Sequence, residues 1–197
     1  MTVAIGIFAF VATLVSLAAL SRLHLLPTGY RPASNAVGDY GVGAYRGHYR
    51  ALTAALAYAA LLVSADIART VQPVPQLLVY LLMTFAAARL AVPSFPADLD
   101  RGQPTPTGRI HLVLDGVAFA SIAWAAAILP DQVDWPGVHG FLVVLGWIIV
   151  AGAVAWALAL TPLLHKRTAP FFGAIERAFY VAVLLWFFVV SVRLALS

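Results

Sequence analysis

The chain has 197 residues, of which 62% are hydrophobic and 10% charged, and its formal net charge is +4. Soluble domains are about 45–50% apolar and about 25% charged, so this composition excludes an ordinary soluble domain and a disordered chain and indicates a membrane protein. The chain contains no cysteine, which excludes disulfides, thiolate metal ligands and cysteine nucleophiles.

Six apolar segments follow one another along the chain, and each is close to the length of about 20 residues that a spanning helix needs. Prolines stand near most of their ends, as is typical where helices start and stop, and we expect Pro130 to close the fourth segment. The pattern predicts an all-α fold, a bundle of six transmembrane helices that forms a single integral membrane domain over residues 1–197. The predicted helices cover residues of about 3–25, 50–68, 74–92, 106–129, 139–164 and 175–196.

Basic residues are divided unevenly between the two ends of this predicted bundle. We call the end with the first, third and fifth connections the basic end, because it holds ten of the twelve Lys and Arg residues: Arg22, Arg31, Arg46, Arg50, Arg89, Arg101, Arg109, Lys166, Arg167 and Arg177. The opposite end carries both termini and holds only Arg69 and Arg193. Cytoplasmic loops are enriched in Lys and Arg. We therefore predict a multi-pass protein of the inner (cytoplasmic) membrane, with the basic end in the cytoplasm and both termini exoplasmic.

These basic residues lie singly or in pairs beside apolar segments, which is typical of the flanks of membrane spans and not of a nucleic-acid site. We expect Arg89 and Arg177 to reach out of the bundle toward the interface with their long side chains. The expected partners are membrane lipids, in particular anionic ones, and no nucleic acid. A homo- or hetero-oligomer in the membrane is left open.

His111 and Asp115 are the leading candidates for chemistry. Asp115 lies about two turns inside the predicted fourth helix, and His111 precedes it by one turn on the same face. Ionisable groups at such depth are costly unless they face the bundle interior, and they commonly mark functional sites. We expect His111 to act as a general acid or base and Asp115 to hold its tautomer. A structural hydrogen-bonded pair and a pair of metal ligands are the alternatives.

Three further acidic residues are expected at the same end of the bundle and complete the candidate catalytic set: Asp39, Asp98 and Glu176. Glu176 has a second interpretation, as an acid that interacts with the dipole at a helix N-terminus. A structural zinc site needs four ligands in a recognisable spacing, and none is found. No metal and no cofactor are therefore predicted, although zinc and haem stay open as alternatives.

The start of the fourth helix predicts an anion site. Thr105 and Pro106 fit an N-cap followed by proline at the first helical position. Free N–H groups and the positive end of the helix dipole favour anions at such a start. We expect Thr105, Thr107 and Arg109 to line a recess for a lipid headgroup. General attraction between a basic protein face and anionic lipid is the alternative.

Three short stretches carry a resemblance to a known family. They are Ser-Asn-Ala-Val-Gly-Asp-Tyr-Gly-Val-Gly at residues 34–43, Phe-Pro-Ala-Asp at 95–98 and Thr-Gly-Arg-Ile-His at 107–111. Their order resembles the DUF998 family of six-helix bacterial and archaeal membrane proteins. This resemblance implies the fold but no mechanism. The first stretch is also similar to Frag1/DRAM-like families, whose members are linked to lipid handling, and that kinship implies an exoplasmic first loop.

The sequence thus favours lipid handling or lipid chemistry at the cytoplasmic membrane interface, through a polar site around His111 and Asp115. Two alternatives stay open. One is a small-molecule or proton-coupled transporter in which Asp115 titrates, and the other is a non-catalytic accessory subunit of a membrane complex. Whether the protein is an enzyme is left undecided.

The orientation is testable because the natural chain has no cysteine. Single cysteines at Gly102 and Gly137 place one thiol at each end of the bundle. An impermeant thiol reagent added to intact cells should label position 137 and spare position 102. The reverse labelling pattern would contradict a cytoplasmic basic end and would favour the exoplasmic first loop of the Frag1-like arrangement.

Overall fold

The computed structural model of the protein describes residues 2–99 and 105–196. Six long helices make up most of it: α1 (Thr2–Leu25), α2 (Arg46–Thr70), α3 (Gln76–Ala91), α4 (Pro106–Gln132), α5 (His139–Ala159) and α7 (Phe172–Ala195). A short helix α6 (Pro162–Thr168) and the 3-10 turns η1 (Gly38–Gly41), η2 (Val92–Ser94) and η3 (Ala169–Phe171) lie between them. Strands are absent from these described ranges.

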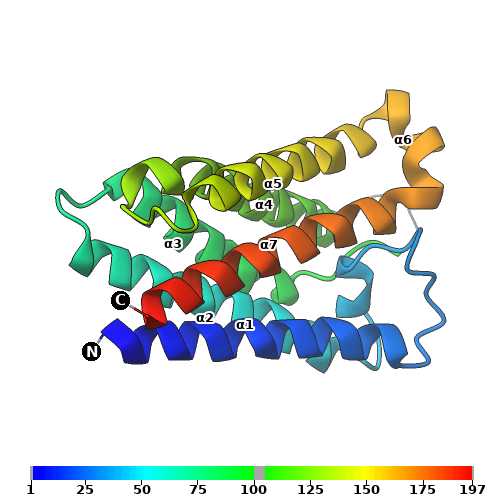
Figure 1. The fold of residues 1–197 in the computed structure, drawn as a ribbon. Coiled ribbons are helices and arrows are strands. Elements are labelled where there is room, and N and C mark those ends of the chain that lie inside the picture. Colours follow the sequence, from blue (N-terminus) through cyan, green and yellow to red (C-terminus); the bar gives the residue numbers. More distant parts are fainter. Residues whose placement is uncertain (1, 100–104, 197) are drawn as a thin grey trace.

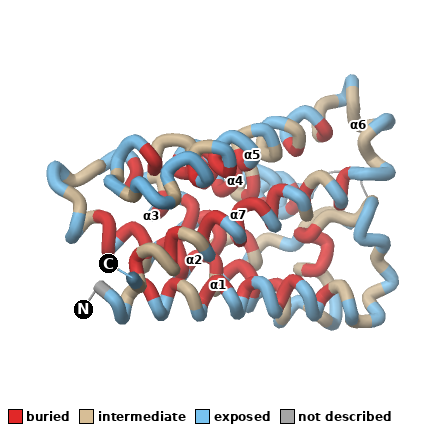
Figure 2. Tube along the Cα trace, in the orientation of Figure 1, coloured by how far each residue is buried: buried red, intermediate tan, exposed pale blue. Residues whose placement is uncertain are grey.

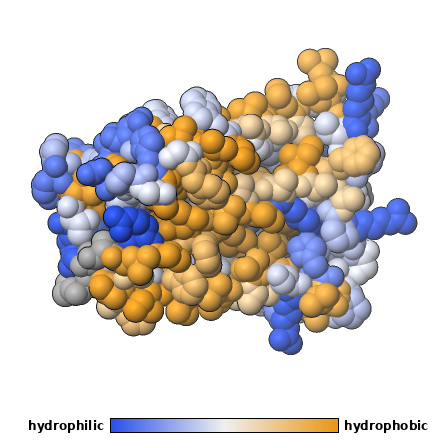
Figure 3. Space-filling model, in the orientation of Figure 1, coloured by the Kyte–Doolittle hydropathy of each residue, from blue (hydrophilic) through white to orange (hydrophobic). Residues whose placement is uncertain are grey.

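Six helical segments of the described chain are long and apolar enough to cross a membrane, the last of them running from α6 through α7. On the face in view, hydrophobic residues cover the middle of the molecule, and hydrophilic residues gather toward both ends (Figure 3). The predicted all-α bundle of six spans is therefore confirmed, and the chain is a multi-pass membrane protein.

The long helices form a closed ring. Each packs against its neighbours in the chain, and α7 packs against α1 as well as α5, so that the last helix returns to the first (Figure 1). Both termini lie at one end of this ring and α6 lies at the other (Figure 1). Buried positions alternate with exposed ones along each helix (Figure 2), because every helix has one face toward the ring interior and one toward the surroundings.

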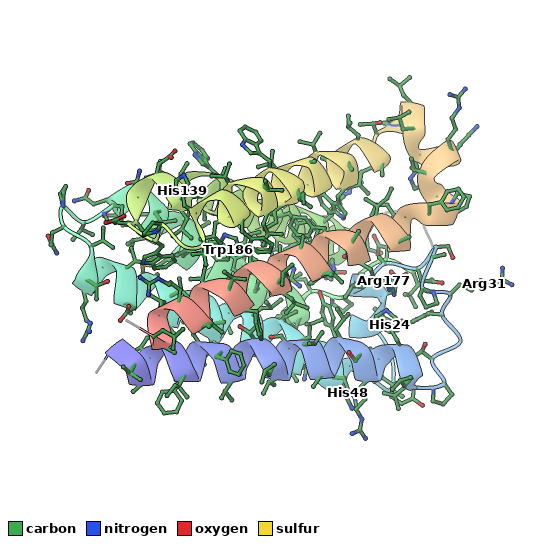
Figure 4. All side chains as sticks on the ribbon, in the orientation of Figure 1. His24, Arg31, His48, His139, Arg177 and Trp186 are labelled. Atoms are coloured by element: carbon green, nitrogen blue, oxygen red, sulfur yellow. The ribbon has the colours of Figure 1, made fainter. Side chains whose placement is uncertain are left out.

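The ring interior is filled by aromatic side chains. The ring of Phe119 on α4 lies 4.9 Å from that of Trp156 on α5, and 4.3 and 5.8 Å from those of Phe179 and Tyr180 on α7. Trp186 on α7 is completely buried and lies deep among the helices (Figure 4). Such contacts bury large apolar areas and fix the helices relative to one another.

Two helix ends differ from the prediction, and a proline lies at or near each of them. Pro130 does not close the fourth helix, because α4 continues to Gln132. The fifth helix, expected to reach residue 164, ends at Ala159, and Pro162 opens the separate helix α6. Proline at position 162 has no N–H for the Leu158 carbonyl. That carbonyl accepts the Thr161 hydroxyl instead, at 2.7 Å.

The other helix limits differ from the prediction by a few residues. The second helix begins at Arg46 and not near 50, and the last begins at Phe172 and not near 175. Arg101 and Gly102, which entered the orientation argument, lie outside the described residues.

Helices α4 and α5 approach closely at Ala126, one turn before Pro130. Because Pro130 has no N–H, the Ala126 carbonyl lacks its usual helical partner. It lies against Gly146 of α5, where a Cβ atom would be only 2.6 Å from the Ala126 oxygen. Glycine at 146 therefore permits backbone contact between the two helices, a form of packing that is common in membrane bundles.

A larger residue at Gly146 should separate α4 from α5. We expect Gly146→Val to lower the free energy of unfolding by about 1–3 kcal/mol, the usual range for overpacking. The measurement is denaturation in detergent micelles followed by tryptophan fluorescence. Gly140→Val is the matched control on the same helix, because no atom lies within 4 Å of a Cβ at Gly140. Equal effects of both variants would show that the close approach does not contribute to stability.

Candidate functional site

A pocket of about 220 Å³ lies at the basic end of the ring, between α4, α5 and α7. The loops that follow α1 and α3 cover it, and α6 contributes to its rim. Its polar lining consists of Asp39, Asp98, His111, Asp115, His165 and Glu176. All five candidate catalytic residues of the sequence analysis therefore line one cavity. His165 was not among the candidates. The sequence predicts one continuous helix over residues 139–164, whereas His165 lies on the separate helix α6 that begins at Pro162.

Asp115 at the base of this pocket is paired with Arg89. The two side chains are almost completely buried, and Arg89 Nη1 donates to Asp115 Oδ1 at 2.6 Å. Arg89 Nη2 donates to the hydroxyl of Tyr180 on α7. The faces of the Phe119 and Tyr180 rings lie 5.9 and 5.4 Å from the guanidinium carbon, within the range of a cation–π contact.

The expectation that Arg89 reaches out to the interface is wrong. Arg89 lies in the last turn of α3, but its side chain points into the ring, where the Asp115 carboxylate supplies the opposite charge. A buried charge is tolerated when it is paired and hydrogen-bonded. The ion pair also confirms that Asp115 faces the bundle interior.

His111 is held by hydrogen-bond acceptors on both sides of its ring. Nδ1 lies 2.7 Å from the Phe95 carbonyl oxygen, and Nε2 lies 3.1 Å from Asp115 Oδ2. A ring that carries a proton on each nitrogen donates to both. We had expected Asp115 alone to orient the ring. The Phe95 carbonyl holds Nδ1 as well, and Asp115 lies beside Nε2.

Two acids hold the first loop: Asp39 bonds within the loop itself, and Glu176 attaches the loop to the bundle. Asp39 Oδ2 accepts from Asn35 Nδ2 at 3.1 Å and from the Ala36 N–H at 3.0 Å. Glu176, on α7, accepts from the Val37 N–H at 2.7 Å. Because α7 begins at Phe172, Glu176 lies beyond the first helical turn and belongs to the pocket wall instead of interacting with a helix N-terminus.

Arg177 strengthens this attachment from the far side of the loop. Its Nε donates to His24 Nε2 and its Nη1 to the Asn35 carbonyl, both at 2.6 Å, and its Nη2 reaches the Tyr40 hydroxyl at 3.2 Å. Figure 4 shows Arg177 and His24 pointing toward each other from α7 and α1. Arg177 was expected as an interface anchor. It instead joins α1, the first loop and α7 at the basic end.

The start of α4 has the predicted cap. The Thr105 hydroxyl accepts from the Gly108 N–H at 3.1 Å, and Pro106 occupies the first helical position. The Thr105 N–H and hydroxyl donate to the Asp98 carboxylate at 3.0 and 2.7 Å, so a carboxylate of the chain itself occupies this helix start. Thr107 and Arg109 are exposed and do not line the pocket. The headgroup site at Thr105, Thr107 and Arg109 stays a prediction about the outer surface.

A metal centre gains no candidate from the described chain. Within residues 2–99 and 105–196, no three His, Asp or Glu side chains gather closely enough to hold a metal ion. The chemistry that this arrangement supports is hydrogen bonding and proton transfer, centred on His111.

The sequence of this chain matches the model of one protein family, described as a protein of unknown function (DUF998), over residues 5–193. No curated protein and no solved structure matches the chain.

The buried ion pair makes a strong prediction about stability. Arg89→Met leaves Asp115 without its counter-charge and should lower the free energy of unfolding by about 3–5 kcal/mol. The double variant Arg89→Met/Asp115→Leu removes both charges and should recover at least half of that loss. Unfolding in detergent micelles, followed by tryptophan fluorescence, measures both. Arg50→Met, a substitution of an exposed arginine at the same end, is the control. A double variant less stable than Arg89→Met would contradict the pairing.

Proposed function

The chain belongs to the DUF998 family, and we propose that this member handles or chemically modifies a lipid at the membrane interface, in the pocket around His111 and Asp115. One observation carries the proposal. The pocket lies in a bundle of helices long enough to span a membrane, at the basic end, and is lined by two histidines and four carboxyl groups. Polar pockets with acid–base groups are the default candidates for binding and catalysis.

The depth of the pocket suits a lipid headgroup. Asp115 lies nine residues after Pro106, about 14 Å along α4 at 1.5 Å per residue. The pocket therefore extends from the interface to the outer part of the hydrocarbon layer. A headgroup that enters it leaves its chains in the surrounding bilayer, so the lipid does not have to leave the membrane to reach His111.

His111 is the residue we assign to proton transfer. The Phe95 carbonyl fixes its ring, and Nε2 lies beside Asp115. Asp115 stabilises a protonated ring, and Arg89 in turn holds Asp115 in place. When a headgroup enters, Nε2 exchanges its contact with Asp115 for one with a headgroup oxygen, gives that oxygen its proton and later takes one back. The wall carboxylates are hydrogen-bond acceptors for the headgroup.

The transporter alternative receives less support. A transporter needs a path from the pocket to the opposite end of the bundle. Beneath Asp115 the ring interior is filled by Arg89, Tyr180 and Phe119, all of them buried. This filling favours a site that exchanges its ligand at one end. The presence of a polar pocket also favours a ligand-binding protein over a purely accessory subunit.

Histidine substitutions test the proposal. Purified protein in vesicles of phosphatidylethanolamine and phosphatidylglycerol that also contain a monoacylglycerol is followed by mass spectrometry. The lipids converted with time and the lipids retained on repurification are both measured. His111→Gln should lower conversion about 100-fold or more, the usual contribution of a positioned acid or base. His139→Gln is the matched control, because His139 is exposed at the opposite end (Figure 4). Equal conversion and equal lipid retention by the two variants would contradict a lipid site at His111.

A further inference from the structure

An apolar groove of about 520 Å³ lies between α4 and α5, next to the pocket. On α4 four of its six lining residues are small, Gly116, Ala120, Ala123 and Ala127, and the other two are Phe119 and Trp124. Trp156 of α5 lines both the groove and the pocket. The groove lies inside the two spans, so its surroundings in the membrane are lipid hydrocarbon.

The pocket and the groove follow the same stripe of each helix. On α4 the pocket takes Gly108, His111 and Asp115, and the groove begins with the next residue, Gly116. The stripe continues to Ala127 in steps of three or four residues, the spacing of one helix face. Residues 116–127 extend over about 16 Å at 1.5 Å per residue. The two recesses therefore lie end to end along the seam between α4 and α5.

The seam has a physical reason to be hollow. The backbones of α4 and α5 are in contact at Ala126 and Gly146, toward the opposite end. Nearer the basic end, the ring of Trp156 lies between the helices against Phe119, with 4.9 Å between ring centres. Small residues on α4 leave the seam beside Trp156 unfilled. An alkyl chain, which brings no polar group, suits this apolar lining.

The polar end of the combined recess is rich in hydrogen-bond acceptors. Asp39 and Glu176 each use only one carboxylate oxygen in the hydrogen bonds described above, whereas Asp98 and Asp115 use both. The neighbouring arginines are already engaged: Arg89 binds Asp115 and Tyr180, and Arg177 binds His24 and the first loop. A head that donates hydrogen bonds, through hydroxyl or ammonium groups, complements this lining better than a phosphate does.

From these observations we propose that the pocket and the groove together hold one amphiphile. Its hydrogen-bond-donating head lies among the carboxylates of the pocket, and a single alkyl chain lies along the α4–α5 groove past Trp156. The inference rests on the proposed lipid-handling function and narrows it to a class of substrate.

The test uses three photoactivatable probes with the same alkyl chain, each with a diazirine near the chain end. One is a monoacylglycerol, whose head has two hydroxyl donors. The second is the methyl ester, which has none, and the third is a monoacyl phosphate. After irradiation of the purified protein, mass spectrometry locates the label. The monoacylglycerol should label residues 116–127 and 147–157 at least fivefold more than either comparison probe.

Two alanine variants provide the structural control. Ala120→Phe fills the groove and should reduce labelling at least fivefold. Ala151→Phe makes the same change at an exposed position of α5 that does not line the groove, and should leave labelling unchanged. Stronger labelling by the phosphate would overturn the assigned head chemistry.

The outcomes separate this inference from the proposed function. Equal labelling of the groove by all three probes, or labelling that Ala120→Phe does not reduce, overturns the single-amphiphile inference. Labelling outside the groove that depends on the glycerol head overturns it as well. Neither result contradicts lipid conversion that depends on His111. Labelling that is selective for the monoacylglycerol and is lost in Ala120→Phe supports the inference, whatever the histidine variants show. Equal lipid conversion by His111→Gln and His139→Gln would remove only the chemistry assigned to His111.

Discussion

The ion pair between Arg89 and Asp115 is the constraint on which the rest of the structure depends. A charged side chain costs about 2.5–3.5 kcal/mol at the centre of a spanning helix on insertion scales, so Asp115, well inside its span, faces away from lipid. Arg89, in the last turn of α3, turns inward to pair with it. Their pairing fixes the rotation of α3 against α4, and the hydrogen bond from Arg89 to Tyr180 extends the constraint to α7. Three of the six ring helices are thereby oriented by one charged cluster.

This cluster also forms the base of the pocket. Asp115 uses one carboxylate oxygen for Arg89 and the other for His111. The charge that stabilises the bundle therefore also lies against the imidazole ring of the histidine. The loops complete the pocket from above. Glu176 holds Val37, Arg177 holds Asn35, and the Phe95 carbonyl holds His111. Stability and the proposed function are therefore coupled, because the contacts that close the bundle at its basic end also shape the pocket.

Helices α4 and α5 contribute the part of the site that has no polar residues. Their backbones are in contact at Ala126 and Gly146, whereas nearer the basic end the ring of Trp156 packs between them against Phe119. The difference in side-chain volume thus leaves a recess along the α4–α5 seam. Trp156 lines both this recess and the polar pocket.

Composition, length and local spacing were sufficient for the architecture. They predicted six spans, the Thr105 cap and the inward orientation of His111 and Asp115, since each depends on properties that a short stretch carries by itself. The tertiary structure alone decided the partners. Arg89 lies near the end of its span, where a sequence reading expects an interface anchor, and only the packing of α3 against α4 turns it inward. Other contacts likewise join segments that are far apart in the chain. Phe95 binds His111, Val37 binds Glu176 across 139 residues, and the groove lies between α4 and α5. No local pattern encodes such contacts, because they depend on how the helices rotate and approach within the ring.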